Sequence, residues 1–379
     1  MHDNVYSGVF QGAETMLISL AEYAKLHDKS SDTLRRLAER GAFHTAQKIG
    51  RNWVVDNNEE YPVQKRSPKN GARNIRSTVV SLFSGCGGMD LGFIGGFEFL
   101  GKKYPKTGFE IIWANEISPA ACKTYEQNIG SHIVNADIND AIDQMPKTAD
   151  VVIGGFPCQD ISINGKMRGI KGARSGLYTY IVEAVKKIKP KIFIAENVGG
   201  LLLKQNEYSL RKILEDFNAL GYEISYQLYR AVDYGVPQTR ERVFIVGTKK
   251  GLPKFTPPQP TKKHPITAKE AIGDLEELSQ NEKFSHIWSL ANVSGEQGNR
   301  RLLADRPGYT IRAECHGNIQ FHYTLPRRIS MREAARIQSF PDSFIFPCKL
   351  RETERQIGNA VPPVLAWHVA KSAKRIVSE

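Results

Sequence analysis

The sequence predicts an α/β fold with a largely parallel, doubly wound sheet, and two observations support this prediction. From Ser77 to Gly247, short apolar runs alternate with segments of helical periodicity, which is typical of a parallel sheet covered by helices on both faces. On either side of this region the chain becomes basic and irregular, so further units are expected there. The expected strands are Thr78–Phe83, Glu110–Ala114, His132–Asn135, Asp150–Gly154, Lys191–Ala195, Tyr226–Val232 and Val243–Gly247, and the clearest helices are Leu177–Lys189 and Tyr208–Leu220.

The composition of the sequence favours some binding partners and argues against several kinds of site. The 379 residues carry a formal net charge of +12, which favours a polyanionic partner such as nucleic acid. The five cysteines are widely spaced and form no C-x-x-C pair, which argues against a disulfide framework and against a zinc site. No signal peptide and no apolar run of about 20 residues is present, so we expect a cytoplasmic protein without a membrane partner or a metal.

Four regions are predicted along the chain. A small module, residues 14–63, is joined by a basic linker, 64–77, to the α/β domain. After Gly247 a stretch rich in Lys and Pro leads into an irregular, polar segment, and helical pattern returns at Ser330–Phe340 and Val364–Ile376. The α/β domain is therefore assigned to residues 78–248 plus 327–379, and a separate irregular domain to residues 249–326.

The first module resembles a winged helix-turn-helix of the excisionase or MerR-like kind. Ser30 or Ser31 can cap a second helix that places Arg35, Arg36 and Arg40 on its exposed side. Such a module would bind DNA, and the alternative is a helical cap that packs on the next domain. The pattern predicts helices over Leu17–Leu26 and Asp32–Arg40, followed by strands over Ala42–Ile49 and Asn52–Val55 that flank a turn at Gly50-Arg51.

Cys158 follows a predicted buried strand. Gly154, Gly155 and Pro157 end the apolar run, so the thiol should lie on a loop at the carboxyl end of the strand, where open α/β sheets bind ligands. A lone free cysteine is often only a small buried hydrophobic side chain, which is the alternative interpretation.

A second cluster predicts a cofactor site. An apolar strand runs into the glycine-rich turn Phe83–Gly88 and then into a helix, which lets a ligand approach the backbone closely. Glu116 ends the second strand and can accept both hydroxyls of a ribose, and Asp137 follows the third. Together these features favour a cofactor that contains a nucleoside.

Two further groups complete the pattern. Glu196 lies at the end of the strand next to Cys158, so both can face one substrate. In Gln238-Thr239-Arg240-Glu241-Arg242, alternation places Gln238, Arg240 and Arg242 on one face, where two guanidinium groups could converge on an anion. An ordinary strand edge with salt bridges is the alternative.

In this order the motifs closely resemble those of DNA cytosine-5 methyltransferases of the bacterial restriction-modification kind. The resemblance covers about Thr78 to the carboxyl terminus and does not cover the first 75 or so residues. The motifs are Phe83-x-Gly85-x-Gly87-Gly88, Gly155-Phe156-Pro157-Cys158-Gln159, Glu196-Asn197-Val198, Gln238-x-Arg240-x-Arg242 and Gly358-Asn359-Ala360-Val361-Pro362-Pro363.

The resemblance implies a methyltransferase with a Rossmann-like sheet, S-adenosyl-L-methionine as cofactor and double-stranded DNA as substrate. The Cys158 thiolate would add to C6 of a flipped-out cytosine, and Glu196 would act at N3. Arg240 and Arg242 would provide positive potential for the thiolate. The implied cofactor-binding residues are Phe83, Gly85, Gly87, Gly88, Glu116, Asp137, Ile138, Pro157, Leu177, Asn359 and Ala360.

The resemblance also implies a mobile catalytic loop over Ile161–Arg174 and a target-recognition domain at 249–326. The expected DNA-binding residues are Ser162, Asn164, Lys166, Arg168, Gln238, Thr310 and Arg312, with Arg35 and Arg36 in the first module. A restriction endonuclease could act on the same site without direct contact. Methylation of tRNA, which shares this chemistry in a sister family, and a role as transcriptional regulator remain alternatives.

Overall fold

The computed structural model describes residues 16–27, 29–39, 43–50, 52–59, 76–156, 176–261, 264–289, 301–313 and 320–378. The chain divides into two compact units, Met1–Arg73 and Asn74–Glu379. The division falls inside the predicted basic linker, residues 64–77.

The first unit contains the two helices and the hairpin that the sequence predicts. Its strands form an antiparallel sheet in the order β1-β3-β2, and α1 begins with a capping box made by Ser19 and Glu22. Leu20, Tyr23 and Leu34 are buried in its small core. One element was not predicted, because residues 17–19 pair with β3 rather than extend the helix. The elements are β1 (Leu17–Ser19), α1 (Leu20–Leu26), α2 (Ser31–Glu39), β2 (Gln47–Ile49) and β3 (Asn52–Asp56).

The second unit is built on a seven-stranded sheet in the order β11-β12-β10-β9-β4-β7-β8. The pairs β4–β7, β7–β8, β4–β9 and β9–β10 are parallel, and β12 runs antiparallel to β10 and β11. This confirms the predicted largely parallel sheet. The strands are β4 (Ser77–Leu82), β7 (Phe109–Glu116), β8 (Ile133–Asn135), β9 (Val151–Gly155), β10 (Ile192–Val198), β11 (Tyr222–Arg230) and β12 (Glu241–Lys249).

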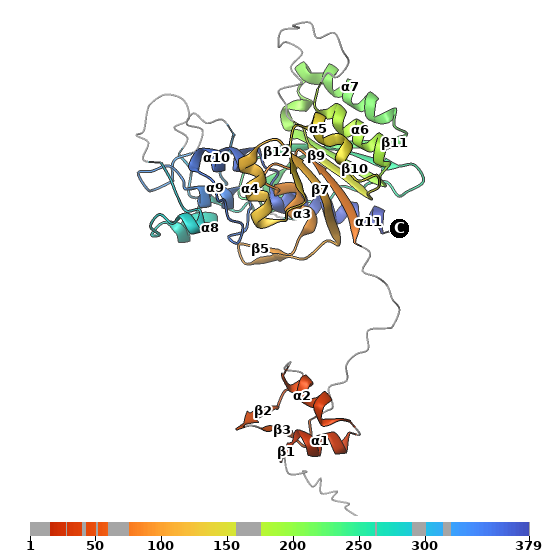
Figure 1. The fold of residues 1–379 in the computed structure, drawn as a ribbon. Helices are drawn as coiled ribbons and strands as arrows, with labels where there is room; N and C mark the ends of the chain where they lie inside the picture. The colour runs from red at the N-terminus through yellow and green to blue at the C-terminus, as the bar shows by residue number, and fades with distance from the viewer. Residues whose placement is uncertain are drawn as a thin grey trace, which may run out of the picture. The chain divides into compact units, whose positions relative to one another are not determined.

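Helices cover both faces of this sheet (Figure 1). Successive strand residues point to opposite faces. Accordingly, Val79 belongs to a core shared with α3 and α11, whereas Val80 belongs to a core shared with α5, α6 and α7. The helices are α3 (Gly88–Ile94), α4 (Pro119–Asn128), α5 (Ile138–Ala141), α6 (Tyr178–Ile188), α7 (Glu207–Asn218), α8 (Ala268–Ile272), α9 (Met331–Ile337), α10 (Leu350–Asn359) and α11 (Pro363–Val377).

Two features of the second unit differ from the simple alternating pattern. A hairpin of β5 (Phe97–Phe99) and β6 (Lys102–Tyr104) follows α3 and was not predicted. The described part of the irregular segment 249–326 shares a third core with α9 and α10, in which Leu302 and Ile311 are buried together with Phe340.

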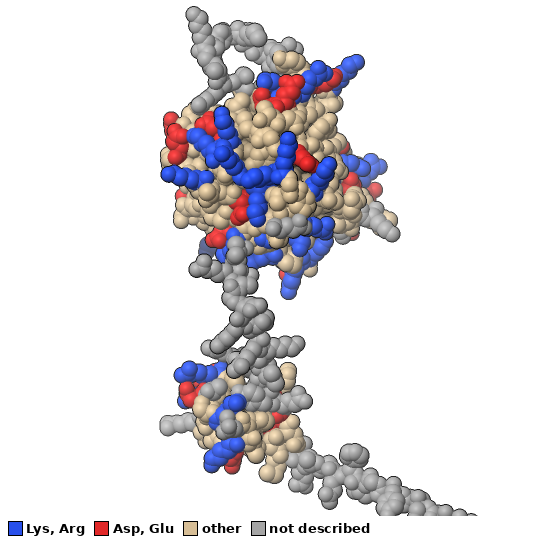
Figure 2. All heavy atoms as spheres, turned by 90° about the vertical axis from the view of Figure 1, so that its right-hand side faces the viewer, with Lys and Arg blue, Asp and Glu red and all other residues tan. Residues whose placement is uncertain are grey.

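Charge is distributed over both units. In the face shown in Figure 2, Lys and Arg side chains occur on the N-terminal unit and across the larger unit. Within the described ranges, no helix combines the length and the hydropathy needed to span a membrane.

Candidate active site

A cavity of about 860 Å³ opens at the carboxyl ends of the parallel strands. The strand order places the ends of β4, β7, β9 and β10 at one edge of the sheet, so residues distant in sequence meet there. The cavity brings together most of the predicted site residues. Those in its wall are Phe83, Gly85, Gly88, Glu116, Asp137, Ile138, Leu177, Glu196, Arg242, Thr310, Arg312, Asn359 and Ala360.

The glycine-rich turn forms one wall of the cavity. Phe83, Gly85 and Gly87 all have positive φ, at 55°, 57° and 91°. A Cβ on Gly88 would lie only 2.5 Å from the Val361 carbonyl oxygen, so glycine lets the two segments touch. Gly87, although predicted to bind the cofactor, does not line the cavity; it is the left-handed N-cap of α3.

Glu116 is fixed by two backbone N–H groups. Gly85 N donates to Oε2 over 3.0 Å, and Ser118 N donates to Oε1 over 2.9 Å. Burial raises the pKa of Glu116, although these hydrogen bonds oppose the rise. A carboxylate oxygen accepts more than one hydrogen bond, so Glu116 can still bind hydroxyls in the cavity.

Asp137 lies on the exposed rim as the N-cap of α5. Its Oδ1 accepts from the backbone N–H and from the side-chain amide of Asn139, both over 2.9 Å. Ile138 beside it is buried and adds an apolar surface. An aromatic ring, two hydrogen-bond-accepting carboxylates and an apolar wall together fit an adenosine group.

Glu196 lies near the end of β10 and forms a buried ion pair with Arg242 of β12. Arg242 Nε is 2.8 Å from Glu196 Oε1, and Arg242 Nη1 donates to the Glu241 carbonyl over 2.7 Å. Burial raises the pKa of Glu196 despite the positive charges of Arg242 and Arg240. A Cβ on Gly155 would lie 2.9 Å from Glu196 Oε2, so this glycine leaves room for the Glu196 carboxylate.

The structure corrects the interpretation of Arg240 and Gln238. Arg240 is fully buried and donates to the carbonyl oxygens of Ile311, Gly358 and Ala360 over 2.9–3.0 Å. Its guanidinium therefore positions the backbone around the cavity rather than facing an anion in it. Gln238, predicted to bind DNA, is also fully buried; it accepts from Ile311 N over 3.0 Å and donates to the Ile337 carbonyl over 3.1 Å. The face that Gln238 and Arg240 share is covered by the segments around Ile311, Ile337 and Ala360, which belong to the third core. The sequence did not reveal this packing.

Thr310 and Arg312 join the predicted recognition segment to the cavity. Thr310 Oγ1 donates to the Thr239 carbonyl over 3.5 Å. A Cβ on Gly358 would lie 2.4 Å from the Arg312 carbonyl carbon, so this glycine lets the segment pack on α10.

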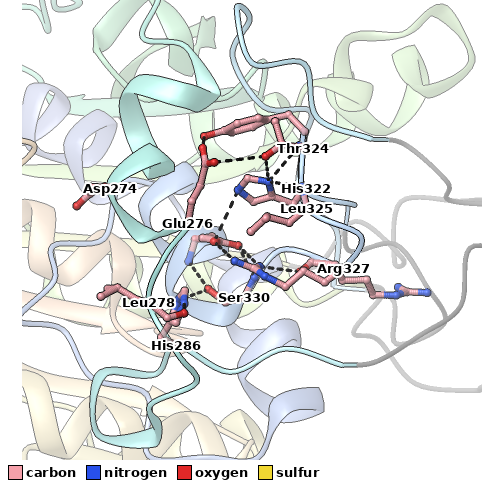
Figure 3. Close-up of polar contacts among 12 residues, drawn as sticks. Asp274, Glu276, Leu278, His286, His322, Thr324, Leu325, Arg327 and Ser330 are labelled. Carbon is pink, nitrogen blue, oxygen red and sulfur yellow. Dashed lines mark hydrogen bonds and ion pairs between the residues drawn. The ribbon is translucent and has the colours of Figure 1, made fainter.

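A buried network ties the same segment to α9 (Figure 3). Glu333 accepts from both terminal nitrogens of Arg327, over 2.7 and 2.8 Å, and from Ser330 N over 2.7 Å. The Ser330 hydroxyl lies 2.9 Å from His286 Nδ1, and His322 Nε2 lies 3.9 Å from the carboxylate. The pair of Arg327 and Glu333 was not predicted from the sequence, although the spacing of Ser330 and Glu333 is that of a capping box.

Cys158 and Pro157 lie outside the described residues, as do Ser162, Asn164, Lys166 and Arg168. Phe156 is the last described residue before them and lines the cavity.

In the first unit, Arg35 and Arg36 are exposed as predicted. Arg35 pairs with Glu39 over 3.2 Å, and Arg36 pairs with Asp32 over 3.0 Å. In the part of the chain that the structure describes, no group of three or more His, Cys, Asp or Glu side chains could hold a metal ion.

Comparison with known proteins gives consistent matches over the second unit. A family model described as C-5 cytosine-specific DNA methylase matches residues 77–292 and 278–375. Type II methyltransferase M.NgoFVII of Neisseria gonorrhoeae is 36% identical over 337 residues, which cover 79% of this chain and 87% of the relative. Type II methyltransferase M.FnuDI of Fusobacterium nucleatum is 34% identical over 342 residues, covering 79% and 95%. The structure of the S. pombe Dnmt2 methyltransferase matches 80% of this chain and 99% of its own, with a TM-score of 0.57 and 18% identity.

Proposed function

The chain belongs to the C-5 cytosine-specific DNA methylase family and is a DNA cytosine-5 methyltransferase; from this premise we propose which residues carry out the reaction. The proposal rests on one observation. A single cavity is lined by the residues predicted to bind the cofactor and by the Glu196–Arg242 pair. Phe156, which precedes Cys158 by two positions in the sequence, also lines it.

The family implies S-adenosylmethionine as methyl donor, and the cavity fits it. Glu116 would accept the ribose hydroxyls, and Phe83 would contact the adenine. When bound, S-adenosylmethionine supplies an electrophilic methyl group on its sulfonium. Pro157, Leu177, Asn359 and Ala360 would complete the wall around it.

The protein's own residues activate the cytosine. C5 is a poor nucleophile, so the Cys158 thiolate first adds to C6 and makes C5 electron-rich. Glu196 in its protonated form donates to N3, which offsets the negative charge that the addition places on the ring. The raised pKa of Glu196 favours this protonated form. After methylation, a base such as water takes the proton from C5, the C6–S bond breaks, N3 returns its proton to Glu196, and 5-methylcytosine and the thiolate are released.

Cytosine in a duplex cannot reach a thiol within a cavity, so the base must flip out of the helix. Lys166 and Arg168 would contact the phosphate backbone, while Ser162 and Asn164 would fill the space that the base leaves. Thr310 and Arg312 would face the DNA from the recognition segment, residues 249–326. The first unit would bind DNA as a winged helix-turn-helix and could repress the chain's own gene.

Bisulfite mapping tests this proposal. The chain and its Cys158→Ala variant are expressed separately in a bacterial host that lacks cytosine methylation. We expect 5-methylcytosine in a short recurring sequence with the intact chain and none with the variant. A restriction endonuclease encoded beside the chain should then be blocked by that methylation. Unmodified DNA from a folded protein would contradict the proposal and favour an RNA substrate.

A further inference from the structure

A buried carboxylate in the cavity wall has no role in the reaction described above. Asp90 follows the glycine-rich turn, in the first turn of α3, and is fully buried. Its Oδ2 accepts from the Ser81 hydroxyl over 3.1 Å, and its Oδ1 accepts from the Tyr125 hydroxyl over 3.1 Å. Burial raises the pKa of Asp90 to about 6, and the groups that oppose the rise are hydrogen-bond donors rather than a cation. A buried anion without a cation is costly unless a ligand compensates its charge.

The hydrogen bonds around Asp90 have a defined direction. A carboxylate only accepts, so the single proton of Ser81 points to Asp90. Ser84 Oγ therefore donates to Ser81 Oγ over 2.9 Å, and the Ser81 carbonyl oxygen, 3.3 Å away, is a second acceptor for the same proton. Ser84 has then used its only side-chain proton, and its oxygen can only accept from a further partner. Ser84 is half-buried and lines the cavity, so the chain of hydroxyls presents an acceptor to a bound ligand.

The other side of Asp90 reinforces this direction. Tyr125 donates to Asp90, so its oxygen can accept from His132 Nε2, which lies 3.0 Å away. Asp90 is thus the terminal acceptor for hydroxyls that arrive from both sides. A Cβ on Gly87 would lie 2.9 Å from the Tyr125 ring and closer still to Ile129, so this glycine lets the turn pack against the ring of Tyr125.

We propose that Asp90, through Ser81 and Ser84, positions an acceptor for the α-ammonium group of S-adenosylmethionine, an inference that rests on the proposed function. Ribose hydroxyls are assigned to Glu116 and the adenine to Phe83, while the sulfonium has no proton to donate. The two carboxylates Glu116 and Asp137 are assigned to the donors of the adenosine, so the ammonium is the remaining donor, and as a cation it also compensates the charge of Asp90. Asp90 is therefore a positioning residue for the amino-acid end of the methyl donor.

Isothermal titration calorimetry on the full chain tests the proposal with two probes. S-adenosylhomocysteine carries the amino-acid group, whereas 5′-methylthioadenosine keeps the adenosine and lacks that group. We expect Asp90→Asn to weaken S-adenosylhomocysteine about 10-fold or more and to change 5′-methylthioadenosine by less than about 2-fold. Ser84→Ala, at a half-buried position, should show the same selectivity, so the test survives if Asp90→Asn does not fold.

Ser118→Ala serves as the matched control, because Ser118 lines the cavity on the ribose side beside Glu116. Any loss that it causes should be equal for both probes. Equal losses in the Asp90→Asn and Ser84→Ala variants would overturn the inference. Failure of the unmodified chain to bind S-adenosylhomocysteine would instead contradict the proposed function.

Discussion

Two buried pairs of glutamate and arginine in the second unit have similar partners but different surroundings. Glu196 pairs with Arg242 at the cavity, and Glu333 pairs with Arg327 between α9 and the segment before it. Both carboxylates are buried. They differ in how many of their lone pairs the protein uses, and this difference separates a chemical role from a structural one.

Glu333 accepts from protein donors on both of its oxygens. It accepts two parallel bonds from Arg327 and one from the backbone N–H of Ser330, the N-cap of α9, whose hydroxyl contacts His286 (Figure 3). Glu333 is also fully buried and does not line the cavity, so no ligand bound there can reach it. It joins 320–330 to α9 and so fixes the base of the predicted recognition segment.

Glu196 keeps capacity for a substrate. Arg242 approaches it through Nε at a single oxygen, whereas Oε2 faces the Gly155 strand end. Burial raises the pKa of Glu196 in spite of the neighbouring arginines. A buried carboxyl that lines a cavity and can hold a proton is suited to acid catalysis.

The largest expected effect breaks the pair at the cavity. Glu196→Gln should lower kcat by about 10²- to 10⁴-fold, because the amide cannot donate a titratable proton to N3. Binding of S-adenosylhomocysteine should be unchanged, since the proposed function assigns Glu196 to the base and not to the cofactor. Steady-state methyl transfer to duplex DNA measures this effect, with Glu241→Gln as an exposed control on the next strand. A variant within a few-fold of the original kcat would rule Glu196 out as the acid.

Breaking the Glu333–Arg327 pair should lower the stability of the fold instead. Glu333→Gln leaves the Arg327 guanidinium buried without its counter-charge, which typically costs about 3–5 kcal/mol. Urea unfolding of the second unit should show this loss, while the folded variant keeps its affinity for S-adenosylhomocysteine. Glu207→Gln is the control, because Glu207 pairs with Arg211 over 3.2 Å where both side chains are more than 60% exposed, and it should cost about 1 kcal/mol or less. Equal losses in the two variants would contradict the contrast between buried and exposed pairs.

The sequence predicted the residues at the strand ends well, for a physical reason. The alternation of strands and helices implies a parallel sheet, and a parallel sheet brings the residues after its strands to one edge. Glu116 and Glu196 could therefore be placed in one site from the sequence alone. Leu177 and Asn359 came from the family resemblance, because their distance from the turn along the chain leaves no local signal.

The errors arose where long-range packing decides the environment. Arg240 and Gln238 share a face as predicted, but residues 308–313 and the chain near Gly358 cover that face. Those contacts join residues about 70 to 120 positions apart, so periodicity could not reveal them. Asp90 was missed for a related reason: its partners Ser81 and Tyr125 lie on a strand and on a helix, and only folding brings them together.

The smallest effect on stability concerns an exposed pair in the first unit. Arg36 and Asp32 are separated by 3.0 Å on α2, and both side chains are 71% exposed. Exposed i,i+4 pairs contribute about 0.3–0.5 kcal/mol, so Arg36→Ala should hardly change the unfolding free energy.

If this unit binds DNA, the same change should weaken binding to the chain's own promoter and lower the salt dependence by about one phosphate contact. Fluorescence anisotropy at several salt concentrations measures the DNA affinity and its salt dependence. Arg211→Ala is the control, because Arg211 forms an equivalent exposed pair with Glu207 on α7. Identical salt dependence in the two variants would favour the helical-cap interpretation, whereas a loss confined to Arg36→Ala shows that an exposed arginine, negligible for stability, serves recognition.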